Sequence, residues 1–133
     1  MPTMIFINLP VTDLERAKAF YSALGFGINQ QFTDDKASCI VISDTIYAML
    51  VTKDYFSTFS SKTIADTSTS VAAINVLSQD SKDEVDAIAD KALTSGGLQT
   101  NEPQDLGFMY NRSFQDPDGN MWEAFWMDPG HVE

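Results

Sequence analysis

The residue with the clearest chemical potential in this chain is Glu123, a carboxylate inside an apolar run near the C-terminal end. If the run is an extended strand, Met121, Glu123 and Phe125 share one face. Trp122 and Trp126 take the other face, where they either pack in the core or stack on a planar ligand. A charge among apolar side chains costs free energy unless it is paired, protonated or bound to a ligand. Glu123 is therefore the candidate catalytic residue.

Few other side chains offer chemistry to accompany Glu123. Arg112 is the expected partner, either in a structural ion pair or as an anchor for a polar or anionic ligand beside Glu123. The single histidine, His131, lies close to the C-terminus. The single cysteine, Cys39, lies in an apolar run, which favours a buried and unreactive thiol. Most metal and general-base sites use histidine, so the composition disfavours such chemistry.

Length and charge narrow the class of protein. A chain of 133 residues is long enough for one domain with its own core. The formal charge of −11 argues against nucleic acid and anionic membranes as partners and favours solubility. With one cysteine there is no internal disulfide, and no signal peptide or membrane-spanning run is recognisable. We expect a cytoplasmic location.

The apolar periodicity predicts the same succession of elements twice, namely a strand, a capped helix and three strands. Thr12 and Glu15 form a capping box before the first helix, which Gly25 ends. Ser81 and Glu84 do the same before the second helix, which ends at Gly96-Gly97. The predicted strands cover residues 4–11, 26–32, 37–42 and 46–52, then 71–77, 98–100, 108–114 and 120–127. A short helix or loop is expected at 55–59 and a Ser/Thr-rich linker at 62–70.

These patterns resemble the vicinal oxygen chelate superfamily, which includes glyoxalase I, bleomycin-resistance proteins and extradiol dioxygenases. The resemblance rests on Asn8-Leu-Pro-Val-Thr-Asp-Leu14, on Phe20-Tyr21 with Leu24-Gly25-Phe26, and on Asp116-Pro-Asp-Gly-Asn120 with Glu123. It implies an α+β fold in which two βαβββ modules form a curled mixed sheet around a central cavity, with helices on the outer face. The modules are residues 1–61 and 71–133 of one glyoxalase-like domain. A homodimer is also implied.

The same resemblance suggests where metal ligands belong, on the first and fourth strands of each module. These positions are Phe6 and Met49 in the first module and Val71 and Glu123 in the second. Only Glu123 is a suitable ligand, and one carboxylate cannot hold a divalent transition metal tightly. A shift of register adds Asn8 and Asn75, whose amides either bond neighbouring backbone or contact a ligand. We therefore expect no metal cofactor, with a divalent metal as the alternative.

The expected cavity is lined by aromatic, methionine and a few polar side chains, as small-molecule sites usually are. We interpret the chain as a metal-free small-molecule-binding protein of the glyoxalase or bleomycin-resistance type. The alternative is an enzyme, a lyase or dioxygenase acting on a small organic substrate with a metal or with Glu123 as base. The predicted ligand-binding residues are Phe6, Asn8, Tyr47, Met49, Asn75, Tyr110, Arg112, Met121 and Phe125.

Overall fold

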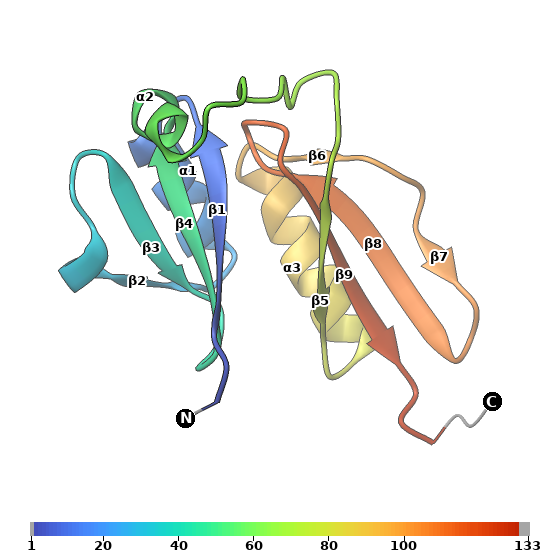
Figure 1. Cartoon of the computed structure of the whole chain (residues 1–133). Coiled ribbons are helices and arrows are strands. Elements are labelled where there is room, and N and C mark those ends of the chain that lie inside the picture. Colours follow the sequence, from blue (N-terminus) through green and yellow to red (C-terminus); the bar gives the residue numbers. More distant parts are fainter. Residues whose placement is uncertain (1, 131–133) are drawn as a thin grey trace. The chain divides into compact units, whose positions relative to one another are not determined.

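The computed structural model describes residues 2–130, and the chain forms two compact units, residues 1–70 and 71–133 (Figure 1). Each unit contains one principal helix and its own β-sheet. His131 lies outside the described residues. None of the helices in residues 2–130 combines the length and apolar character that crossing a membrane requires.

Unit 1 has the strand–helix–three-strand order that the sequence predicted. Its sheet, called sheet 1 here, has the order β1-β4-β3-β2, with β1 parallel to β4 and the other pairs antiparallel. A short helix and a 3-10 turn follow β4, where a short helix or loop was expected. The elements are β1 (Ile5–Val11), α1 (Leu14–Ala23), β2 (Gly27–Asn29), η1 (Gln30–Phe32), β3 (Ala37–Val41), β4 (Ile46–Thr52), α2 (Lys53–Phe56) and η2 (Ser57–Phe59).

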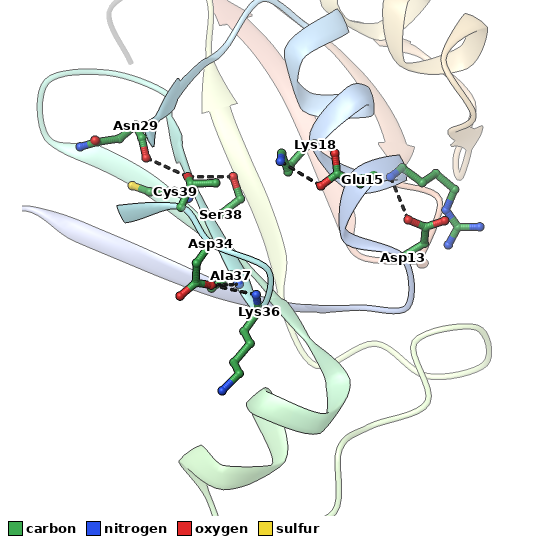
Figure 2. Close-up of polar contacts among 11 residues, drawn as sticks. Asp13, Glu15, Lys18, Asn29, Asp34, Lys36, Ala37, Ser38 and Cys39 are labelled. Atoms are coloured by element: carbon green, nitrogen blue, oxygen red, sulfur yellow. Dashed lines mark hydrogen bonds and ion pairs between the residues drawn. The ribbon is translucent and has the colours of Figure 1, made fainter. Parts of the chain in front are cut away.

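The start of α1 differs from the predicted capping box by one residue. Asp13, not Thr12, is the N-cap, and its carboxylate accepts a hydrogen bond of 3.1 Å from the Arg16 backbone N–H (Figure 2). Glu15 instead pairs with Lys18 at 2.9 Å. The predicted end is confirmed, because Gly25 has φ +102°, a conformation that only glycine adopts freely.

One face of sheet 1 forms the core of unit 1 with α1. The helix buries Leu14, Ala17, Phe20 and Tyr21, and it contacts β3 and β4. In the sheet, strand pairing places Leu9 directly opposite Leu50, and both are buried. On the other face, Phe6 and Asn8 of β1 are exposed, whereas Val51 of β4 is buried. The two faces of sheet 1 therefore differ, as the alternation in the sequence predicted.

Unit 2 repeats the topology of unit 1. Its sheet, called sheet 2 here, has the order β5-β9-β8-β6, with β5 parallel to β9 and with β7 paired to β8. The elements are β5 (Ile74–Ser78), α3 (Lys82–Thr94), β6 (Leu98–Gln99), β7 (Gln104–Asp105), β8 (Met109–Gln115) and β9 (Met121–Met127). The α+β fold class with two βαβββ modules is thus confirmed, while β7 was not predicted.

The second predicted capping box is confirmed for the contact of Ser81 but not for that of Glu84. The Ser81 hydroxyl accepts a hydrogen bond of 3.1 Å from the Glu84 N–H, but the Glu84 carboxylate bonds the N–H of Asp80 at 3.0 Å. Gly96 ends this region with φ +106°. Figure 1 shows α3 lying against one face of sheet 2, where Val85 and Trp122 are fully buried.

The Asp116–Asn120 turn before β9 is held by a buried carboxylate. Asp116 is completely buried and accepts hydrogen bonds of 2.9 Å from the N–H groups of Asp118 and Asn120. Its second oxygen accepts another bond of 2.9 Å from the Asn120 side-chain amide. Gly119 has φ +90°, which explains the glycine at this place. The turn therefore fixes the register of the β8–β9 hairpin.

Candidate functional site

The face of sheet 1 opposite the core carries four of the predicted ligand-binding residues. Phe6 lies opposite Tyr47, and Asn8 lies opposite Met49, so all four share this face. The rings of Phe6 and Tyr47 are stacked, with centroids 4.7 Å apart and an interplanar angle of 11°. Phe6 is nevertheless 46% exposed. Within unit 1, this face presents an aromatic stack flanked by a methionine and an amide.

The face of sheet 2 opposite α3 carries Glu123, with Met121 and Phe125 on either side along β9. Glu123 lies opposite Val76 of β5 and Ser113 of β8. Its side chain is half-buried, as are those of Met121 and Phe125. Within the described part of unit 2, no hydrogen bond or ion pair to Glu123 is formed. A carboxylate between Met121 and Phe125 is therefore left open to a ligand.

The predicted pairing of Arg112 with Glu123 is wrong. Arg112 lies opposite Ala124, so its side chain is on the α3 face of sheet 2, while Glu123 is on the other face. Its Nη1 atom donates hydrogen bonds to the carboxylates of Asp86 at 3.1 Å and Asp90 at 2.8 Å. Burial lowers the pKa of Arg112, but the bonds to Asp90 and Asp86 outweigh this and raise it overall. Arg112 is a structural link between β8 and α3.

Two further predicted ligand-binding residues, Tyr110 and Asn75, also face α3 and not the face of Glu123. The Tyr110 hydroxyl donates a hydrogen bond of 2.6 Å to Asp86, and this bond, with burial, raises the pKa of Tyr110. Asn75 lies opposite Trp122, and its amide donates to the Met121 carbonyl at 3.4 Å. Neither side chain therefore shares a face with Glu123.

The two tryptophans flank Glu123 in the sequence but project from the opposite face. Trp122 is 1% exposed and packs in the core of unit 2. Trp126 is half-buried, with the Lys82 ammonium 5.6 Å from its ring. Core packing, one of the two interpretations of the sequence, is confirmed for Trp122.

The residues on each sheet do not fit the metal that the family resemblance suggested. Val71 lies outside β5, and the residue of β5 beside Glu123 is Val76, which is equally unable to ligate. On sheet 1 the corresponding surface offers Phe6 and Met49. In residues 2–130, no three or more His, Cys, Asp or Glu side chains gather as a metal site would require. One carboxylate whose cross-strand neighbours are a valine and a serine is a poor donor set.

Two side chains missed by the sequence analysis, Val76 and Ser113, are the cross-strand neighbours of Glu123. The position of Ser113 could have been predicted from the tight turn at Asp116–Asn120. This turn pairs Gln115 with Met121, and that pair fixes the register of the remaining β8–β9 pairs, including Ser113 with Glu123. For Val76, β5 must be placed in register with β9, and only the folded structure provides that.

The structure is that of a duplicated βαβββ protein with one such surface on each sheet. Residues 3–43 match the family model described as bleomycin resistance protein-like N-terminal. No curated protein matches the chain significantly. A hypothetical protein from S. aureus is 28% identical, with a TM-score of 0.79 over 95% of this chain and 94% of that one.

Two more solved structures share the fold at lower identity. A glyoxalase/bleomycin resistance protein/dioxygenase family enzyme from Burkholderia phytofirmans is 16% identical, with a TM-score of 0.77 and coverage of 95% and 99%. The fosfomycin resistance protein FosX from Mesorhizobium loti is 14% identical, with a TM-score of 0.70 and coverage of 95% and 92%. These structures share the fold of this chain, and the family match covers residues 3–43, as the resemblance to the vicinal oxygen chelate superfamily predicted.

Proposed function

We propose that this chain binds a small organic molecule, mainly through apolar and aromatic contacts and without the metal of the superfamily. The observation that carries the proposal is the stacked pair of Phe6 and Tyr47 on the face of sheet 1 opposite the core. Ring surface left half-exposed on a rigid sheet favours binding of another planar or apolar group.

Sheet 2 supports the proposal independently. Met121 and Phe125 supply adaptable and aromatic surface on the face of Glu123. Binding sites for small molecules combine such surfaces with a few polar groups that fix orientation. Glu123 supplies the polar group in unit 2, in place of the catalytic role first predicted for it.

A second candidate function is catalysis by Glu123 as a general base, without a metal. It is favoured by the absence of a protein partner for this carboxylate within the described part of unit 2. For any substrate that the protein is found to convert, the Glu123→Gln variant is expected to lose at least about a hundredfold in kcat. Full turnover by that variant would exclude this candidate.

The experiment that tests the binding proposal is a screen of small two-ring aromatic compounds by ligand-observed NMR, followed by calorimetry on those that bind. Intrinsic tryptophan fluorescence is a poor reporter, because Trp122 is buried on the α3 side of sheet 2. The metal content of the purified protein is measured in parallel, since stoichiometric zinc, nickel, manganese or iron would contradict the metal-free proposal.

A matched pair of variants localises the binding. Phe6→Ala removes half of the aromatic stack and should weaken binding of the aromatic compounds about tenfold, or about 1.4 kcal/mol. Phe32→Ala removes an even more exposed phenylalanine of the same unit, on η1, and should leave the affinity unchanged. No binding by any compound, or equal losses in both variants, would refute the proposal.

The expected assembly and location accompany this proposal. We expect a homodimer, which light scattering on the purified protein at several concentrations tests directly. The buried Cys39 thiol is compatible with the cytoplasmic location expected from the sequence.

A further inference from the structure

The face of sheet 2 opposite α3 has an unbalanced charge. Glu123 is the one ionisable side chain on this face among the residues of β5, β8 and β9, and its neighbours there are apolar or neutral. Its closest cross-strand neighbours are Val76 and Ser113. A half-buried carboxylate in such surroundings is more poorly solvated than one in open water. A group that brings positive charge to it would gain more than at a fully exposed site.

The cations of unit 2 are placed where they cannot provide that charge. Arg112 bonds Asp86 and Asp90 on the α3 side of sheet 2. Lys82 belongs to α3 and pairs with Asp105 at 3.2 Å, and Lys91 is an exposed residue of the same helix. These three are the only Lys or Arg residues of positions 71–133. The open carboxylate therefore faces away from each of them.

The net charge of unit 2 also favours a positively charged group at Glu123. Positions 71–133 contain twelve Asp or Glu residues and three Lys or Arg residues, a formal charge of −9 out of the −11 of the entire chain. Such a surplus attracts cations and repels anions over several ångströms of solution. An anionic ligand at Glu123 would meet both this field and the carboxylate itself.

We infer that the group received at Glu123 is a protonated amine carried on an apolar or aromatic body. The inference rests on the proposed binding function and specifies the class of ligand. The ammonium group donates to the Glu123 carboxylate, while the body of the ligand covers Met121 and Phe125. A cation beside Phe125 also gains from the negative face of the ring.

The test compares two probes of nearly equal shape, 2-naphthylmethylamine and 2-naphthylmethanol, by calorimetry in buffer containing EDTA. The amine is charged at neutral pH and the alcohol is not. The wild-type protein should bind the amine at least about tenfold more tightly than the alcohol. Raising the salt concentration should weaken amine binding and leave alcohol binding unchanged.

Two variants that each remove one negative charge locate the effect. In Glu123→Gln the preference for the amine should disappear, while binding of the alcohol is retained. The control is Glu102→Gln, at an exposed position in the segment before β7, which should retain the preference. Circular dichroism and thermal unfolding confirm that both variants are folded, so that any loss of binding belongs to the site.

The outcomes separate this inference from the proposed function. Equal binding of amine and alcohol by the wild type, or an unchanged preference in Glu123→Gln, would overturn the inference while leaving apolar binding intact. An equal loss of preference in both variants would also overturn it, because the long-range field would then be the cause. Failure of both probes, together with every compound of the aromatic screen, would refute the proposed function itself.

Discussion

The link between Arg112 and α3 gives the sharpest test of the structure, by double-mutant cycles. Three single substitutions are made, Arg112→Met, Asp90→Asn and Glu123→Gln, with the double variants that combine the first with each of the others. Methionine keeps much of the packing of the arginine stem while removing the guanidinium. The structure predicts coupling of Arg112 to Asp90 and none to Glu123.

The magnitude follows from the exposure of the three side chains involved. The Arg112 side chain is 13% exposed, whereas those of Asp86 and Asp90 are 45% and 66% exposed. Exposed ion pairs contribute about 0.2–1 kcal/mol, and hydrogen bonds to buried charges contribute about 1.5–3 kcal/mol. With one end buried and the other solvated, we expect Arg112→Met to cost about 1–2 kcal/mol in total. The coupling to Asp90 should be about 0.5–1 kcal/mol.

The assay is equilibrium unfolding in urea, followed by tryptophan fluorescence. Both tryptophans of the chain, Trp122 and Trp126, belong to β9, so the signal reports on unit 2. Urea is preferred to guanidinium because the latter is a salt and would screen the ion pairs under study. Equal m-values among the variants confirm that the differences in midpoint reflect stability.

The result that would refute the structural reasoning is equally specific. Coupling above about 0.5 kcal/mol between Arg112 and Glu123, without coupling to Asp90, would mean that β8 presents Arg112 on the other face of sheet 2. That outcome would reverse the facing of Tyr110 as well, since it lies two residues away on the same strand.

Three further outcomes are expected. Asp116→Ala should destabilise unit 2 by about 2–4 kcal/mol in the same urea assay, because three donors, two of them buried, lose the carboxylate that accepts their hydrogen bonds; a loss below about 1 kcal/mol would contradict this. Tyr110 should ionise only above its ordinary pKa of 10.0, so its stabilising contribution is complete below that value and is lost as pH rises through the higher folded pKa. Ultraviolet titrations of the wild type and of Tyr110→Phe are compared. The tyrosine transition that the variant lacks should lie above the ordinary tyrosine pKa, and a transition at the ordinary pKa would contradict the prediction. Cys39, whose pKa is raised by burial, should react with a thiol reagent only after unfolding, and rapid labelling of the native protein would be the contrary result.

Much of the fold was predictable because its signals are local. The capped helices, the left-handed glycines at positions 25, 96 and 119, and the alternation along β1 and β9 each depend on a few neighbouring residues. Two errors in element boundaries are also local in origin. The first cap moved by one residue because Thr12 and Asp13 are both good caps, and β5 began late because an apolar run alone does not define a strand.

The sequence by itself determined which side chains alternate on each strand, and hence that Met121, Glu123 and Phe125 lie together. Only the tertiary structure decided which strand faces match each other and which face the helix covers. The β8–β9 register places Ser113, and not Arg112, beside Glu123, and α3 then supplies Asp86 and Asp90 as partners for the arginine. The physical reason is that a shift of one residue in pairing exchanges the two faces of a strand, and β8 carries polar and apolar side chains on both faces, so its own alternation leaves that choice open.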